Sequence, residues 1–119
     1  MIVADSVIVE LENEMPIVDW LNTERKIEKL VGYNNFGYNF FHSHEEQAKI
    51  IGGPLLNEIV ENMKDYSKRQ SSHHHVLYSG HSTLLGGMLG SLGALNGLEP
   101  PYSSALIFEL HKNQVKFLR

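Results

Sequence analysis

A histidine follows a tight glycine turn at the point where a short apolar run gives way to a long uncharged segment. Residues 76–78 (VLY) form the run, residues 79–80 (SG) form the turn, and His81 and Ser82 begin the segment. The run predicts a strand buried on both faces, and residues 83–95 predict a helix rich in glycine. The first amides of a helix have no internal partner and the helix dipole favours negative charge, so this junction is typical of an anion site.

The two side chains at this junction differ in the chemistry they can do. The imidazole of His81 can donate a hydrogen bond to a phosphate oxygen or place positive charge beside it. Its alternative role is to cap the helix or to pack at the edge of a sheet. The hydroxyl of Ser82 can donate a hydrogen bond, but serine ionises far too weakly to act as an acid catalyst. The next acid downstream is Glu99.

Two further helices are predicted upstream of this junction. Asn22 or Thr23 can cap the first helix, with Glu24 in the first turn, where the dipole favours an acid. The residues of this helix at core-facing helical spacing are Ile27, Leu30, Val31, Tyr38 and Phe41.

The second upstream helix has a clearer apolar stripe. Its members are Leu55, Leu56, Ile59, Val60 and Met63. Pro54 predicts either the start of this helix or a bend within it. We favour a bend, because residues 45–51 are themselves good helix sequence.

The last third of the chain predicts a hairpin. Asn96-Gly97 is expected to end the glycine-rich helix, and Pro100-Pro101 to prevent it from resuming. Residues 103–110 then predict a strand, residues 112–114 a turn, and residues 115–118 the partner strand.

The composition describes one small globular domain. The chain has 119 residues, of which 42% are hydrophobic and 20% charged, which is ordinary for a globular protein. The net charge of -4 and the absence of a basic cluster argue against nucleic-acid binding. The chain has no cysteine, which excludes a disulfide framework and a thiolate metal site.

Neither a membrane span nor a leader is predicted. The longest uncharged stretch, residues 76–98, is too polar and too rich in glycine for a span. Residues 1–15 include Asp5 and Glu10 and no basic residue, so they do not match a signal peptide. We therefore expect a soluble protein whose localisation the sequence leaves open.

Five blocks in a fixed order carry a resemblance to a known family. They are FGYNFF, IIGGPLLNEIVENM, YSGHST, an apolar helix ending in SLG before NG, and PPYSS followed by IFEL. From about residue 5 to residue 119 the chain resembles the histidine acid phosphatases, the family of the prostatic and lysosomal enzymes. Members of this family are secreted or lysosomal.

The resemblance implies an α/β fold that is a partial histidine-phosphatase (phosphoglycerate mutase-like) fold. Helices at about residues 20–70 are followed by a strand-turn-helix and a C-terminal β-hairpin. Residues 73–119 would be the portion belonging to the α/β core, and residues 1–119 together would form a single partial domain.

The resemblance also implies roles for three residues. Phosphomonoesters are cleaved in this family through a phosphohistidine intermediate, and no cofactor is expected. His81 matches the histidine that binds the transferring phosphoryl group, and Thr83 matches the threonine that follows, so the expected ligand is a phosphomonoester or inorganic phosphate. Ser82 occupies the position of the aspartate that protonates the leaving alcohol. Such an acid is typically worth roughly 100- to 10,000-fold in rate.

The nucleophile is the larger departure from the family. The nucleophilic histidine of the family lies in an R-H-G-x-R-x-P motif, whereas the arginines here are Arg25, Arg69 and Arg119, and none precedes a histidine. Both ends also look cut relative to the family. We therefore expect an acid phosphatase by ancestry, truncated and catalytically impaired, whose isolated chain is inactive or very weak. The alternatives are a non-catalytic phosphate-binding or interaction module, and a truncated gene product whose missing half supplies the motif.

No metal site is predicted from the other histidines. Residues 73–75 (HHH) alternate between faces at a strand start and cannot converge on one ion without a turn, so they are expected to be solvated loop residues. His42 and His44 are two residues apart and do not share a helix face. His111 is expected at the surface beside the hairpin turn.

A strand buried on both faces needs neighbours, and few are predicted. Residues 7–11 predict a short strand or an irregular lead-in, so the chain offers three or four strands at most. Apolar stripes and open sheet edges would then be partly uncovered. We therefore expect a marginally stable chain that self-associates through uncovered apolar surface.

Overall fold

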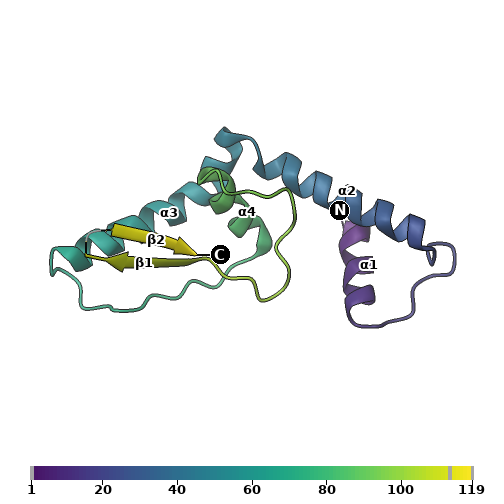
Figure 1. Cartoon of the computed structure of the whole chain (residues 1–119), viewed down its shortest axis with the longest axis horizontal. Helices are drawn as coiled ribbons and strands as arrows, with labels where there is room; N and C mark the ends of the chain where they lie inside the picture. The colour runs from purple at the N-terminus through teal and green to yellow at the C-terminus, as the bar shows by residue number, and fades with distance from the viewer. Residues whose placement is uncertain (1, 113, 119) are drawn as a thin grey trace.

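The computed structural model describes residues 2–112 and 114–118, which form an elongated molecule of mixed α/β structure. In chain order its elements are α1 (Ile2–Glu12), α2 (Glu24–His42), α3 (Glu45–Ser67), α4 (Ser82–Ser91), β1 (Ile107–His111) and β2 (Gln114–Leu118). Figure 1 shows α2 and α3 running end to end, with α1 against α2 and α4 against α3. The radius of gyration is 17.8 Å, whereas a compact domain of this length has about 13–14 Å.

The first segment is a helix, so the expected strand or irregular lead-in at residues 7–11 is wrong. α1 buries Ala4 and Val7, which lie one helical turn apart, and it packs on α2. The β-branched run from Val7 to Val9 favours a strand, but a strand needs a partner with which to pair. Here the available partner is a helix, and packing on it decides the conformation.

α2 begins where the sequence predicts. It starts directly after Thr23, with Glu24 in its first turn. Its fully buried residues, four apart on one face, are Asn34, Tyr38 and His42. This face meets α4, and the Tyr38 hydroxyl donates a hydrogen bond to that helix.

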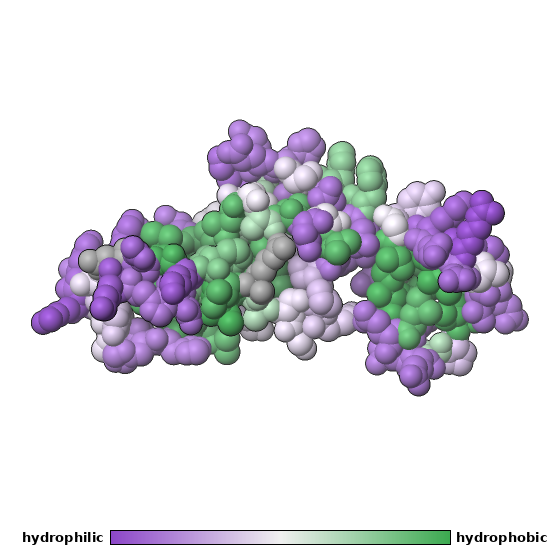
Figure 2. Space-filling view, in the orientation of Figure 1, coloured by the Kyte–Doolittle hydropathy of each residue, from purple (hydrophilic) through white to green (hydrophobic). Residues whose placement is uncertain are grey.

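Much of the apolar surface of α2 is uncovered. Phe41, which the periodicity places in the core, is 48% exposed, so that prediction is wrong. The other predicted core residues near the start of α2, Ile27, Leu30 and Val31, are half-buried. Figure 2 shows apolar surface on this face of the molecule, including a patch over α1 and the adjoining part of α2. The expectation of uncovered apolar stripes is therefore confirmed for α2.

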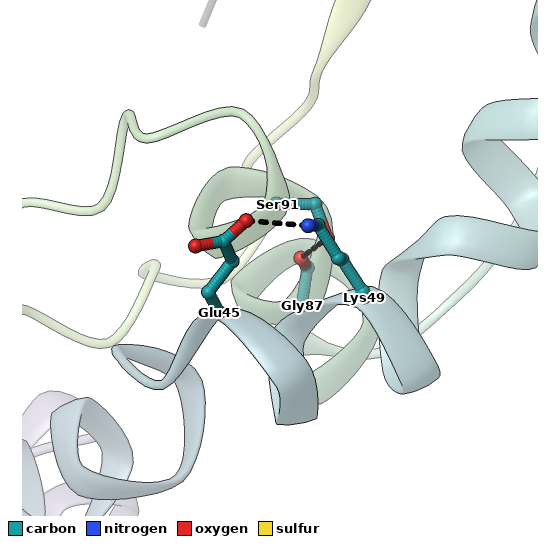
Figure 3. A network of polar contacts seen from close by, with 4 residues as sticks. All are labelled: Glu45, Lys49, Gly87 and Ser91. Atoms are coloured by element: carbon teal, nitrogen blue, oxygen red, sulfur yellow. Dashed lines mark hydrogen bonds and ion pairs between the residues drawn. The ribbon is translucent and has the colours of Figure 1, made fainter.

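α3 continues through Pro54, which confirms that residues 45–51 belong to the same helix. Of its predicted core stripe, Val60 is 44% exposed and the other members are half-buried. Its first turns carry an exposed ion pair between Glu45 and Lys49, drawn in Figure 3. The hydrogen bond from Lys49 and its charge lower the pKa of the Glu45 carboxyl.

The most extensive packing between helices joins α3 and α4. A Cβ added at Gly52 would lie 2.3 Å from the main-chain nitrogen of Met88 and 2.4 Å from the carbonyl carbon of Gly87. The two backbones can approach this closely only because Gly52 has no side chain. In the last turn of α4 the hydroxyl of Ser91 donates a 2.7 Å hydrogen bond to the carbonyl of Gly87 (Figure 3). A Cβ added at Gly87 would lie 2.5 Å from the Ile51 side chain of α3, so a glycine of α4 also permits this close packing.

α4 ends at Ser91 and not near residue 95 as predicted. Gly93 adopts a left-handed conformation with φ of +65°, and its amide donates to the carbonyl of Gly90 at 3.1 Å. The amide of Ala94 donates to the carbonyl of Leu89 at 2.8 Å, which completes the pattern of a Schellman cap. The earliest glycine able to take the left-handed position stops the helix, ahead of Asn96-Gly97.

The predicted buried strand at residues 76–78 does not form. This segment is extended but unpaired, with Val76 48% and Leu77 86% exposed. Only Tyr78 is fastened to a helix: its hydroxyl donates to the Glu58 carboxylate at 3.0 Å and accepts from the Asn62 amide at 2.7 Å. A strand requires a neighbour to satisfy its main-chain groups, and none of the described residues supplies one.

The predicted hairpin is confirmed with a later start. β1 and β2 pair antiparallel, with Phe108 opposite Phe117. β1 begins at Ile107 because residues 101–104 form a turn in which the Ser104 amide donates to the carbonyl of Pro101. The described residues therefore contain two strands and not the three or four expected, and position 113 of the predicted hairpin turn lies outside them. No helix within the described ranges has the length and apolarity needed to cross a bilayer.

Candidate functional site

His81 lies immediately before α4, with its backbone extended at φ -114° and ψ 164°. Its carbonyl accepts hydrogen bonds from the amides of Leu84 and Leu85, at 3.0 and 3.2 Å, so its main chain starts the helix. Its side chain makes no capping bond, is exposed, and has no hydrogen-bond partner among the described residues. The imidazole is therefore available to an external ligand at the positive end of the helix dipole.

Ser82 and Thr83 occupy the first turn of α4 but differ in environment. The Thr83 side chain is exposed, on the open side of the turn. Ser82 is half-buried, and its hydroxyl donates a 2.9 Å hydrogen bond to Oε1 of Glu99. In the sequence Glu99 is only the next acid downstream of Ser82, whereas in the structure it is hydrogen-bonded to Ser82.

Glu99 is held by two helices at once. While Oε1 accepts from Ser82 of α4, Oε2 accepts a 2.6 Å hydrogen bond from the side-chain amide of Asn34 on α2. The main-chain amide of Glu99 donates to Oδ1 of Asn35 at 3.3 Å. Three partners thus fix both the backbone and the side chain of Glu99 at the start of α4.

The segment that follows α4 folds back and places Glu99 beside the first turn of that helix. The side chain of Asn96 accepts a hydrogen bond from the Leu98 amide at 3.1 Å, which closes a tight turn. Pro100 then restricts the residue before it to extended conformations. The signal that could have located the acid is this turn chemistry, Asn-Gly followed by Pro-Pro, which directs the chain back over the helix it has just left.

Tyr38, a residue of α2, hydrogen-bonds to the first turn of α4. Its side chain is 2% exposed, and its hydroxyl donates a 2.8 Å hydrogen bond to the main-chain carbonyl of Ser82. A Cβ added at Gly86 would lie 2.3 Å from the Tyr38 hydroxyl, so α4 rests directly on this ring. Burial, followed by the nearby charge of Glu99, raises the pKa of Tyr38 above its ordinary value. The hydroxyl therefore stays protonated and acts as a donor.

The charges near this turn are few. The ion pairs within the described ranges lie elsewhere, between Glu45 and Lys49, Glu61 and Lys64, and Glu109 and His111. No lysine or arginine of residues 2–112 and 114–118 therefore pairs with Glu99, whose carboxylate accepts hydrogen bonds from two neutral donors near the positive end of the helix dipole.

The remaining histidines do not converge. Residues 73–75 lie in the exposed loop before residue 76, where His74 contacts the Tyr66 hydroxyl at 3.0 Å. This confirms solvated loop histidines, although no strand starts there. His111 is exposed at the end of β1, as predicted, and contacts Glu109 at 3.0 Å. Among the described residues, no group of three or more potential metal ligands comes together.

His42 is buried, which the sequence did not indicate. It ends α2, its ring lies 4.3 Å from that of Tyr38, and its Nδ1 atom is 2.7 Å from the Tyr38 carbonyl. Its Nε2 atom has no hydrogen-bond partner among the described residues. His44, two residues on, is exposed at the start of α3. As predicted, the two imidazoles share no helix face.

Comparisons with known proteins agree with the resemblance seen in the sequence. Residues 5–119 match the family model described as histidine phosphatase superfamily (branch 2). The chain is 39% identical to rat prostatic acid phosphatase over 72 residues, which cover 60% of this chain and 19% of that protein. It is 30% identical to human prostatic acid phosphatase over 111 residues, covering 92% of this chain and 29% of the relative.

A lysosomal relative matches the same share of this chain as the human prostatic enzyme does. The chain is 30% identical to lysosomal acid phosphatase of Xenopus laevis over 114 residues, or 92% of this chain and 26% of that protein. The chain thus spans less than a third of the length of these relatives. With the match covering nearly all of its residues, the chain belongs to the histidine acid phosphatases, in branch 2 of the histidine phosphatase superfamily.

Proposed function

We propose that this chain binds the phosphoryl group of a phosphomonoester, or inorganic phosphate, at the start of α4. The observation that carries the proposal is the exposed imidazole of His81, which lies at the N-terminus of a helix and has no hydrogen-bond partner among the described residues. An exposed histidine alone, or a helix N-terminus alone, would not indicate a binding site, but here the two occur together. The family match adds that relatives are phosphatases by name. The net charge of -4 and the lack of a basic cluster favour a small anion over a nucleic acid as the partner.

We further propose that the isolated chain binds without efficient turnover. Covalent catalysis requires an activated nucleophile. No arginine in the sequence is followed by histidine, so the motif expected to carry the nucleophile has no counterpart. Ser82 stands in the position expected for the acid. The chain would then act as a phosphate-binding part of a phosphatase site.

The test is phosphate binding by isothermal titration calorimetry for the unmodified chain and for His81→Ala. We expect binding that is lost in this variant. The matched control is His75→Ala, another exposed histidine without a hydrogen-bond partner among the described residues, which should bind as the unmodified chain does. Equal affinity in His81→Ala and the unmodified chain would refute the proposal.

Turnover is tested separately with an activated aryl phosphate at about pH 5, near where the carboxyl and imidazole groups titrate. We expect no hydrolysis above that of His81→Ala. Hydrolysis that depends on His81 would show that the chain has recruited another nucleophile, and the proposal of binding without turnover would be wrong.

A second proposed property is self-association through α2. Tyr33, Phe36 and Phe40 are 71%, 69% and 51% exposed, and their spacing of three and four residues puts them on one face. The rings of Phe36 and Phe40 are stacked with centroids 6.3 Å apart, which makes a continuous apolar surface. We propose that a second copy of the chain covers this surface, because exposed apolar patches of this kind mark interaction sites.

A further inference from the structure

The chain places its own carboxylate at the anion site. Glu99 Oε1 lies 2.9 Å from the hydroxyl of Ser82, the first residue of α4 and the neighbour of His81 in sequence. A phosphate bound by the first amides of α4 and by His81 would therefore lie close to a second negative charge. Binding of an anion there has to overcome repulsion from Glu99 or remove its charge.

A proton is the simplest means of removing that charge. We propose that phosphate binds beside His81 together with a proton taken up by the Glu99 carboxylate, so that this site is proton-linked. The inference rests on the proposed function, because it needs an anion at His81. A like charge at a few ångströms disfavours the charged form of a carboxyl group, which is the physical basis of the linkage.

The described residues that interact with Glu99 carry no positive charge. From α2 it meets Asn34, Asn35 and Tyr38, and from α4 it meets Ser82. Of these only Tyr38 titrates, and its hydroxyl is held protonated by burial. The other ionisable group of the site is the imidazole of His81, which is next to Ser82 in sequence.

The hydrogen bonds of Glu99 suit both of its protonation states. As a carboxylate it accepts from Ser82 and Asn34, as observed. When one oxygen carries the proton, that oxygen can donate to the Ser82 oxygen while the hydroxyl of Ser82 turns toward the bound anion. The proton stays on Glu99 in this arrangement, and Ser82 exchanges one hydrogen-bond partner for another without breaking a covalent bond.

The simpler role for Glu99 is structural. Its three hydrogen bonds pin the segment after α4 to two helices, and a negative charge near a helix N-terminus is stabilising. A purely structural role would change the stability of the chain when Glu99 is replaced. It would not change how phosphate affinity varies with pH, so this dependence is the discriminating measurement.

The test compares phosphate affinity in the unmodified chain and in Glu99→Gln at several pH values. The ratio of the two affinities cancels the titration of free phosphate, which is the same in both experiments. We expect Glu99→Gln to bind roughly tenfold more tightly at about pH 7, where a carboxyl group is ionised, and the two to converge at about pH 4. Glu12→Gln on α1 makes the same change of net charge away from α4 and should leave the ratio at one.

A second measurement needs no variant. The side-chain carboxyl of Glu99 in the unmodified chain can be followed by ¹³C NMR while the pH is changed. Because linkage is reciprocal, a tenfold effect on affinity corresponds to a titration midpoint about one pH unit higher when phosphate is saturating. An unchanged midpoint would refute the proton linkage even if Glu99→Gln failed to fold.

The failures of the two proposals are distinguishable. Phosphate binding that is lost in His81→Ala, with an affinity ratio for Glu99→Gln that does not vary with pH, would overturn the proton linkage and leave the proposed function intact. Absence of His81-dependent binding at every pH would overturn both.

Discussion

The hydroxyl of Tyr38 donates a 2.8 Å hydrogen bond to the main-chain carbonyl of Ser82, joining α2 to the first turn of α4. The ring of Tyr38 is buried, and the charge of Glu99 lies close enough to contribute to its raised pKa. One side chain therefore links the only extensively buried face of α2 among the described residues to the turn that carries His81.

Replacing Tyr38 by phenylalanine should destabilise the chain by about 1 kcal/mol, the usual net value of a buried hydrogen bond. The ring and its packing are retained, so the loss reports on the hydroxyl. Urea unfolding monitored by circular dichroism would measure it. Tyr33→Phe is the matched control, because Tyr33 is 71% exposed and its hydroxyl contacts none of the described residues. Equal effects of the two substitutions would contradict a role for the Tyr38 bond.

The same residue predicts a dependence of stability on alkaline pH. Burial raises the pKa of Tyr38 in the folded chain, so the unfolded chain loses this proton first, at about pH 10. The stabilising contribution is therefore fully present below about pH 10 and is lost as the pH rises toward the higher folded value. Urea midpoints measured at about pH 9 and about pH 11 should fall further in the unmodified chain than in Tyr38→Phe. A parallel decline in both would count against this assignment.

Two adjacent glycines of α3 should respond in opposite ways to substitution by alanine. A Cβ at Gly52 would lie within 2.6 Å of three main-chain atoms of α4, so Gly52→Ala should cost about 1–3 kcal/mol or more. A Cβ at Gly53 meets nothing within 4 Å, so Gly53→Ala should stabilise the helix by up to about 1 kcal/mol. Thermal unfolding of the two variants measures both, and a destabilised Gly53→Ala would contradict the open surroundings of Gly53.

Introducing an aspartate next to His81 should be unfavourable in this chain. In Ser82→Asp a second carboxylate would stand about where the Ser82 hydroxyl now lies, 2.9 Å from Oε1 of Glu99. Two carboxyl groups at this separation hold a shared proton to higher pH, so their coupled pKa is raised in the folded chain. Stability relative to the unmodified chain should therefore be lost as the pH rises from about 4 to 7.

The partner substitution supplies the control for this prediction. Adding Glu99→Gln to Ser82→Asp removes the repulsion and should recover most of the stability lost at neutral pH. The comparison of the two single variants with the double variant isolates the interaction between the two sites. If the double variant were no more stable than Ser82→Asp, the two side chains would not be neighbours.

Self-association should depend on the aromatic face of α2. Phe36→Ser with Phe40→Ser removes two stacked, exposed rings and should shift the chain toward the monomer in sedimentation velocity experiments. Leu77→Ser changes a side chain that is 86% exposed on a different segment and should leave the distribution unchanged. A monomeric unmodified chain at high concentration would rule out the second copy as the cover for this surface.

Local signals made α2, α3 and the hairpin predictable. Thr23 with Glu24 marked the start of α2, and good helix sequence on both sides of Pro54 indicated one continuous α3. Phe108 and Phe117 face each other across a hairpin whose strands are close in sequence. These elements depend on interactions between near neighbours, which a single sequence displays.

Distant interactions account for what the sequence could not reveal. Val76 and Leu77 have the composition of a buried strand, but burial depends on whether another strand lies beside them. His81 could be placed at the start of a helix from sequence alone, whereas the arrival of Glu99 at Ser82 depends on a turn and on Asn34 of α2. Sequence separation made Glu99 seem remote from a residue that it contacts.

The hydrogen bonds of Glu99 make α4 and the segment that leaves it a single opening unit. The chain departs from the end of α4 at Gly93 and is fastened again at its beginning through Ser82, so residues 92–99 cannot detach without breaking the hydrogen bond between Glu99 and that turn. Amide hydrogen exchange in the segment and in that turn should therefore share one opening free energy. A ligand that clamps the first turn would then slow exchange in residues that it never touches.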